Sequence, residues 1–445
     1  MNRLLPLQRE LFSVTLSLSL YGFASSLIGV FIPLIILNTG APLSLVAGFY
    51  ATYALVKLVL NYPAALIIQR FGPHIGLGGG VVAGVLQLLA ILLYANTRSL
   101  AALTLGAVAL AITNAFLWNS QHIHISRIMD GATKSSSMAT MEIIRQITTV
   151  AAPLIGGLIA ATVGPSWVIA AAVIIAAAAL IPLRDVAALY HQGSQVAGAR
   201  EEEGEMKQAG RAEETTSEVG DVAQPRGPHY DTSPVQRREE VVFAANHTTA
   251  TRLAYDFRGA PPRDIFANFC FNLDTAIGSF VWPMYLAVAI AGYRGIGVIA
   301  GLSAATAIAT VWIAGRRGDR GHDRAVLRQG ITASSVIHLL RLAAATPLFI
   351  TLLSAGYRAA LAYFQNAWTS TYYHHAKKHG IAYVMSMEIA CDLAYAALWS
   401  LILVLALTTS HTVLFNVCFI IAATASWGCL LISKQGAFES DSPSA

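Results

Sequence analysis

Apolar residues along the chain gather into long runs that are separated by short polar turns. A helix needs about 20 apolar residues to cross about 30 Å of hydrocarbon, and most of these runs have about that length. They predict membrane-spanning helices near 11–37, 43–68, 76–95, 100–120, 138–163 and 166–183, and six more near 264–291, 295–314, 329–346, 348–373, 380–408 and 411–433. The pattern therefore predicts an all-α polytopic membrane protein with twelve transmembrane helices.

A long polar segment separates the first six predicted helices from the last six. It covers 185–260 and lacks apolar periodicity, which predicts a largely disordered linker; a small folded or regulatory module there is the alternative. The chain then divides into an N-terminal six-helix bundle at 1–184, this linker, a C-terminal six-helix bundle at 261–434 and a short tail at 435–445.

Composition excludes a soluble globule. Of the 445 residues, 55% are hydrophobic and 12% are charged, whereas about 25% are charged in an ordinary soluble protein. The net charge of +5 does not indicate nucleic-acid binding, because the basic residues cluster in the short loops between apolar runs. The expected partners are instead the lipid bilayer and a small solute.

The distribution of Lys and Arg predicts the orientation of the helices. Basic residues crowd the side that holds the N-terminus, and the opposite side offers only Arg98 and Arg294. Because cytoplasmic loops carry the excess of Lys and Arg, both termini and the linker are predicted to be cytoplasmic. The expected location is the cell (inner) membrane, which the protein crosses many times as a monomer.

The two halves of the chain also repeat each other. Arg70 and Arg320 follow the second and the eighth predicted helix, and Trp118 and Trp368 lie in the fourth and the tenth. Both pairs are separated by 250 residues. A duplicated six-helix unit explains these matches, so the two bundles are expected to be pseudo-symmetric.

The turn after the eighth predicted helix carries the most specific motif. It is the run Gly315-Arg316-Arg317-Gly318-Asp319-Arg320-Gly321-His322-Asp323-Arg324. With two six-helix halves and a cytoplasmic linker around it, this run resembles the loop motif of the major facilitator superfamily. The resemblance implies that Gly315 lets helices approach closely, that Asp319 caps or pairs across the cytoplasmic gate, and that Arg320 and Arg324 tie down neighbouring helix ends.

The first-half copy of this motif, around Arg70, departs from the family pattern. Gln69 stands where an acid is expected, and Ala65 stands where a glycine is expected. A strong charge-based lock at this first loop is therefore not predicted.

Several charged residues lie deep inside predicted helices. A charge in hydrocarbon costs at least about 2.5 to 3.5 kcal/mol, so each one is a functional hypothesis. Asp274 and Arg358 lie near the midplane, Lys57 lies near the middle of the second helix, and Glu388 and Asp392, four apart, face one side of the eleventh. The alternative for all of them is a structural ion pair at a helix interface.

Three hypotheses assign roles to these charges. Asp274, or failing it the pair Glu388 and Asp392, carries proton coupling, because burial favours the neutral form of an acid. Arg358 holds an anionic or polar solute, or pairs with Asp274 when the site is empty. Lys57 pairs with Asp392 or Glu388 between the halves, because their depths agree to within about 1.5 Å and the family resemblance implies that helices two and eleven face each other.

Three other charged residues are not expected to bind the solute. Glu142 and Arg145, three residues apart near the start of the fifth helix, are expected to form a local pair with a role in proton coupling or gating and not to belong to the substrate site. Arg341 is set aside, because it lies about five residues from a membrane face and a long basic side chain can snorkel to the surface.

Polar and aromatic residues supply candidates for solute binding. The resemblance implies that helices one, four, seven and ten line a central cavity, where polar groups could hydrogen-bond a solute and rings could hold its apolar parts. Hydrogen bonding between helices and interfacial belts are the alternative. The candidates are Tyr21, Asn114, Trp118, Asn119, Asn272, Asp274, Trp282, Arg358, Gln365, Asn366 and Trp368.

The working hypothesis is a secondary active transporter that moves a small solute by alternating access, coupled to protons. An uncoupled facilitator, and a non-transporting membrane enzyme, receptor or scaffold on the same fold, are the alternatives. No Walker A sequence or nucleophile elbow supports an enzyme. The histidines near the cytoplasmic ends of the fourth and tenth helices are interpreted as loop-edge residues, and neither a metal nor a cofactor is predicted; they are His122, His124, His374, His375 and His379.

Overall fold

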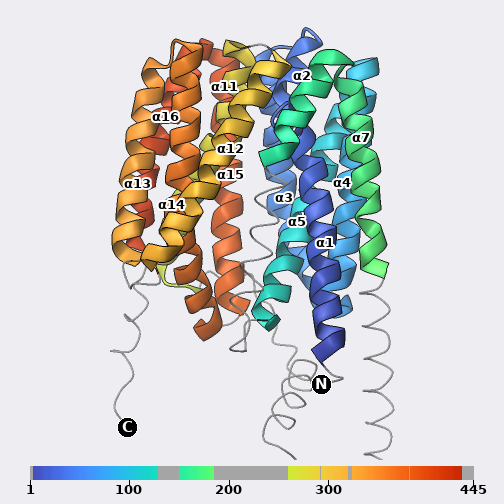
Figure 1. Ribbon diagram of the computed structural model, residues 1–445, viewed down its shortest axis with the longest axis vertical. Helices are drawn as coiled ribbons and strands as arrows, with labels where there is room; N and C mark the ends of the chain where they lie inside the picture. The colour runs from blue at the N-terminus through green and yellow to red at the C-terminus, as the bar shows by residue number, and fades with distance from the viewer. Residues whose placement is uncertain are drawn as a thin grey trace, which may run out of the picture. The chain divides into compact units, whose positions relative to one another are not determined.

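The computed structural model of the protein describes residues 4–128, 150–184, 259–290, 292–318, 323–379 and 381–432. Every regular element in these ranges is helical, which confirms the predicted all-α fold class. Figure 1 shows the helices of the first half, in blue to green, beside those of the second half, in yellow to red. The predicted linker lies almost wholly outside the described residues, so its boundaries and its disorder stay predictions.

The first half contains six predicted spans, and a described helix overlaps each of them, although only 150–162 of the fifth span, 138–163, is among the described helices. The first span is split into α1 (Leu4–Gly29) and α2 (Ile32–Asn38). The others correspond to α3 (Leu43–Phe71), α4 (Pro73–Thr97), α5 (Leu100–Ile128), the helix Val150–Thr162 and α7 (Pro165–Ala178).

The second half follows the same order. Its first span comprises α10 (Pro262–Ala276), a π-helical turn (Ile277–Val281) and α11 (Trp282–Ala289). The next elements are α12 (Tyr293–Gly318), α13 (Asp323–Leu340) with the 3₁₀ turn η3 (Arg341–Ala343), α14 (Pro347–His379), α15 (Ile381–Thr408), and α16 (His411–Gly428) with the 3₁₀ turn η4 (Cys429–Leu431).

Among the described residues, nine helices are long and apolar enough to cross a membrane. The three other predicted spans differ from these in identifiable ways. The helix Val150–Thr162 is short within the described range, α10 and α11 are separated by the π-helical turn, and α13 carries many polar residues. The protein is thus a multi-pass membrane protein, whereas the count of twelve helices stays a prediction.

Prolines explain why the first span of each half is interrupted. The ring of a proline clashes with the carbonyl of the residue four positions earlier and removes a helix donor. Pro33 lies in the first turn of α2, and Gly29, four positions earlier, ends α1. Pro283 lies in the first turn of α11, and Ser279, four positions earlier, lies in the π-helical turn. The two prolines are 250 residues apart, so the interruption follows the sequence repeat.

The halves contact each other from their far end, opposite to where α1 begins, down to the middle of the helices. Tyr50 on α3 stacks on Trp399 on α15, with ring centroids 4.5 Å apart. A Cβ atom added to Gly157 would lie 2.9 Å from the Cα of Gly297 on α12, so two helix backbones meet there. This far end is therefore closed in the present structure.

Candidate functional site

A buried polar cluster joins the two halves near the middle of the bundle. Lys57 Nζ on α3 lies 2.5 Å from Asp392 Oδ1 on α15, and Asn61 Nδ2 donates to Asp392 Oδ2 at 2.6 Å. Asn119 on α5 donates to Asn61 Oδ1 at 2.7 Å. All four side chains are buried. We call Lys57, Asn61, Asn119 and Asp392 the inter-half cluster.

Helix periodicity places these groups. Lys57 and Asn61 are one turn apart on α3, so they present two donors in a row to the two oxygens of one carboxylate. Glu388 lies one turn before Asp392 on the same face of α15. The predicted pairing of Lys57 with Asp392 is confirmed, and its role in gating stays a prediction.

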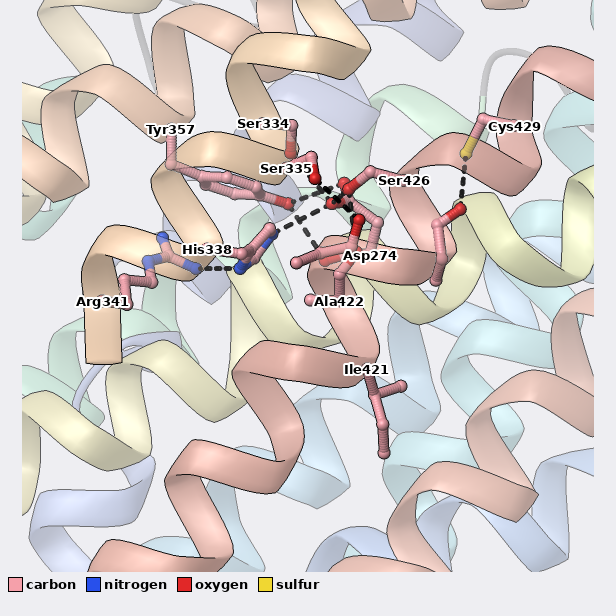
Figure 2. A network of polar contacts seen from close by, with 12 residues as sticks. Asp274, Ser334, Ser335, His338, Arg341, Tyr357, Ile421, Ala422, Ser426 and Cys429 are labelled. Carbon is pink, nitrogen blue, oxygen red and sulfur yellow. Dashed lines mark hydrogen bonds and ion pairs between the residues drawn. The ribbon is translucent and has the colours of Figure 1, made fainter.

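A second buried cluster lies within the second half and centres on Asp274 of α10. Figure 2 shows the side chains of Ser334, His338, Tyr357 and Ser426 pointing toward this carboxylate. Its Oδ1 accepts hydrogen bonds from Ser334 at 2.9 Å and Ser426 at 2.7 Å, and lies 3.0 Å from His338 Nε2. Tyr357 Oη donates to the backbone oxygen of Asp274 at 3.1 Å and lies 3.4 Å from its Oδ2.

Arg341 completes this second cluster from η3. Its Nη1 lies 3.0 Å from His338 Nδ1 (Figure 2). Its guanidinium carbon lies 4.2 Å and 4.5 Å from the ring centroids of Trp282 and Tyr357. Only 1% of Arg341 is exposed. We call Asp274, Ser334, His338, Arg341, Tyr357 and Ser426 the C-bundle cluster.

The interpretation of Arg341 as a snorkelling residue is wrong. The predicted ninth span begins at 329 and ends at 346, whereas α13 begins at Asp323 and ends at Leu340. The chain then turns through η3, which brings the guanidinium inward between aromatic rings instead of outward to a membrane face. His338 contacts Asp274 and Arg341 contacts His338, two contacts that the sequence did not predict.

The other predicted solute-binding residues have varied surroundings. Asn114 accepts a hydrogen bond from Trp118, whose side chain is 42% exposed, whereas Trp368 is buried and stacks on Phe271 at 4.7 Å. The repeated tryptophans therefore have different environments. Asn272 accepts a hydrogen bond from Cys391, next to the inter-half cluster.

Three further candidates lie between or beside helices. Tyr21 fills the space beside Gly84, where an added Cβ would lie 2.4 Å from its ring, so it packs between α1 and α4. Arg358 and Gln365 on α14 are partly buried. Their role in binding a solute stays a prediction.

Some predicted residues cannot be compared with the structure. Glu142, Arg145, Asp319 and Arg320 lie outside the described residues, as does the side chain of Asn366. The structure does describe two other residues of the loop motif. Gly315 lies near the end of α12, and Arg324 donates to the carbonyl oxygens of Leu430 and Ile432, which ties the start of α13 to η4 and the residue after it.

The histidine at 375 is not a loop-edge residue. His375 is buried on α14, and its Nδ1 lies 3.3 Å from both Asp264 Oδ2 and Tyr383 Oη. Within the described part of the chain, no three His, Cys, Asp or Glu side chains converge as metal ligands would.

A sequence model of the Major Facilitator Superfamily matches residues 14–387. The chain belongs to this superfamily. Among solved structures, one that resembles this superfamily member is the crystal structure of a D-xylose-proton symporter, with a TM-score of 0.59 at 10% sequence identity. The match covers 95% of this chain and 97% of the symporter, and at this identity it shows the fold alone. No curated protein matches the chain.

Membership of the Major Facilitator Superfamily supports a secondary transporter. The contacts in the structure show which residues sequence reasoning missed. Asn61, His338, Tyr357 and Ser426 were not selected as site residues. One signal was available for Asn61, which lies one turn from Lys57 on the same helix face. The others are recognised only once α10, α13, α14 and α16 are known to enclose Asp274.

Proposed function

We propose that the protein moves a small solute across the membrane by alternating access, coupled to proton movement. The inter-half cluster is the observation that carries this proposal. Lys57 and Asp392 belong to different halves, and a charged pair buried between two bodies that move biases their equilibrium by its energy difference between the two states. Membership of a superfamily of transporters supports the same reading.

The present conformation corresponds to one state of this cycle. The Tyr50–Trp399 stack and the Lys57–Asp392 pair join the halves from the far end to the middle of the helices. Opening the far end would separate both contacts and admit water to the two charges. A second state that is open at the far end is therefore part of the proposal.

The solute site is proposed on the helices that flank these contacts. Arg358 and Gln365 on α14, Asn114 and Trp118 on α5, and Asn272 on α10 offer hydrogen-bond donors, acceptors and one cation. Such a set fits a small polar or anionic solute. D-xylose is a reasonable first test compound, because the structurally similar symporter is named for it.

Uptake by purified protein in liposomes tests this function. Labelled D-xylose, other sugars, amino acids and organic anions would be offered with and without an imposed pH gradient. Accumulation above the external concentration in the presence of the gradient supports a proton-coupled transporter. Equilibration without accumulation would identify an uncoupled facilitator, and no uptake of any compound would reject transport in favour of a scaffold or receptor.

The cytoplasmic location of both termini and of the linker is part of the proposal. Reporter fusions at Ala445 and within 185–260 would test it, because the reporter signals depend on the side of the membrane. An external signal from either fusion would contradict the proposed orientation of the protein in the membrane.

A further inference from the structure

The hydrogen bonds of the C-bundle cluster fix the protonation of His338. Arginine carries donors and no acceptor, so the contact between Arg341 Nη1 and His338 Nδ1 at 3.0 Å requires Nδ1 to accept. The single ring proton then lies on Nε2, which donates to Asp274 Oδ1 at 3.0 Å. His338 is therefore neutral in this conformation, and the charges of Asp274 and Arg341 balance each other.

Asp274 is held as a carboxylate by donors that come from separate helices. Ser334 and His338 on α13 and Ser426 on α16 all reach Oδ1. The Ser426 hydroxyl also lies 2.8 Å from the carbonyl oxygen of Ala422 and shares its single proton between the two acceptors, so Ser334 and His338 are the donors that hold the negative charge. The carboxylate thus stays in place as a fixed counter-charge for the imidazole ring.

Arg341 is held mainly through the faces of its guanidinium group. Trp282 and Tyr357 lie against it, while its Nε and Nη2 have no hydrogen-bond partner among the described residues. Cation–π attraction requires that the guanidinium group faces the rings, and it changes little when this group rotates within its own plane. The guanidinium can therefore move its Nη1 away from His338 and keep the stabilisation that the rings provide.

We propose that His338 is the proton-binding residue of the C-bundle cluster and that Arg341 controls its access to protons. The proposal rests on the proton-coupled transport proposed above. When Arg341 Nη1 leaves His338, the free Nδ1 takes a proton from a hydronium ion and the ring becomes an imidazolium. Its Nε2 still donates to Asp274. Return of Arg341 places two donors face to face, so Nδ1 gives its proton back to water.

This exchange couples protonation to conformation. Proton uptake adds one positive charge to a buried site, which is unfavourable unless Arg341 reaches water or an anionic group. A state of the transporter that offers Arg341 such a partner would therefore bind the proton, and a state like the present one would release it. An anionic solute would give Arg341 its partner and would thereby favour proton binding at His338.

Other charged and titratable groups lie near His338, so the test has to separate their effect on its protonation from the effect of Arg341. Tyr357 and Arg358 approach from α14, Cys429 approaches from η4, and Cys270 lies on α10 with Asp274. Arg341 is the cation in contact with the ring. Its substitution is thus the most direct way to change proton binding at His338.

Nitrogen-15 NMR of ring-labelled histidine in the full-length protein in lipid nanodiscs tests the proposal without any solute. His338→Gln identifies the signals of His338. We expect the Nε2–H tautomer in the wild type. In Arg341→Met the ratio of imidazolium to imidazole at a given pH should rise about tenfold or more, as expected when one adjacent buried charge is removed. Arg341→Lys should give a smaller change, and the signals of the exposed His411 should not respond.

The outcomes separate this proposal from the proposed function. An Nδ1–H tautomer in the wild type, or an unchanged ratio in Arg341→Met, would overturn control by Arg341. If Arg341→Met does not fold, the wild-type tautomer and Arg341→Lys decide the same question. Full gradient-driven accumulation of a solute by His338→Gln would overturn its role in coupling, whereas failure of the wild type to transport any compound would reject the transport function and leave the tautomer result standing.

Discussion

The two buried polar clusters differ in what they join. The inter-half cluster connects α3 and α5 of the first half with α15 of the second, whereas every member of the C-bundle cluster belongs to the second half. In alternating access the halves move relative to each other, so contacts between them have to open while contacts within one half can persist. Equal burial in the present structure therefore does not imply an equal role.

Their chemistry fits this difference. Asp392 is bound by one cation and one amide, and a buried ion pair adds little net stability because desolvation offsets attraction. Such a pair can open at modest cost when water enters. Asp274 is bound by donors from α13, α14 and α16, which makes a rigid site suited to hold a proton-binding group in place.

The largest expected effect is the loss of stability in Asp274→Leu. This change leaves Arg341 buried without a counter-charge and removes the acceptor for Ser334, His338 and Ser426. We expect a destabilisation of about 3 to 5 kcal/mol in chemical unfolding of the purified protein. Asp392→Leu should cost less, because the unpaired Lys57 can gain water when the halves separate. An equal loss in both variants would contradict the distinction between the clusters.

The next effect concerns the pair between the halves. Lys57→Met and Asp392→Leu should each impair solute uptake, because each leaves one buried charge without its partner. The double variant removes both charges, so its loss should be smaller than the sum of the single losses by about 2 kcal/mol or more in apparent activation energy. Strictly additive losses would show that the pair does not contribute to the transport cycle.

Closure of the far end depends on a close approach of two helices. An alanine methyl group at Gly157 would lie 2.8 Å from the backbone oxygen of Tyr293, so Gly157→Ala should separate the halves there and cost about 1 to 3 kcal/mol. Gly79→Ala is the matched control, because no atom lies within 4 Å of its added Cβ. Spin labels at Thr97 and Thr409 would report the separation, and equal distances in both variants would contradict the steric argument.

The sequence predicted contacts that depend on how deep a residue lies in the membrane. It missed contacts that depend on which neighbouring helix each helix face meets. Lys57 and Asp392 were paired correctly because residue counts along two spans give their depths, and the family resemblance gives adjacent helices. For Asp274, depth alone left open which neighbours it faces. Only the packing of α13 and α16 around α10 brings His338 and Ser426 to it.

The error at Arg341 has a related cause. The charged residues Asp323, Arg324 and Arg328 make the start of α13 look like a loop, so the predicted span begins six residues late, and the apolar residues after Arg341 extend it past the true helix end. The predicted span places Arg341 about five residues from a membrane face. In the structure α13 ends before these apolar residues, and η3 turns Arg341 toward His338 in the C-bundle cluster.

The smallest effect separates two neighbouring serines on α13. Ser334 donates to the carboxylate of Asp274 at 2.9 Å, whereas Ser335 donates to the backbone oxygen of Ala423 at 2.8 Å. A hydrogen bond to a charged group contributes about 1.5 to 3 kcal/mol and a neutral one about 0.5 to 1.5 kcal/mol. Ser335 also accepts a hydrogen bond from Trp427 Nε1 at 3.1 Å, so Ser334→Ala and Ser335→Ala should destabilise the protein by similar amounts. The pH dependence of uptake discriminates between them. Ser334→Ala removes a donor from the proton-binding cluster and should shift the pH profile, while Ser335→Ala should lower stability and leave the profile unchanged. A shift of equal size in both variants would mean that the profile reports general packing of α13 and not the charge on Asp274.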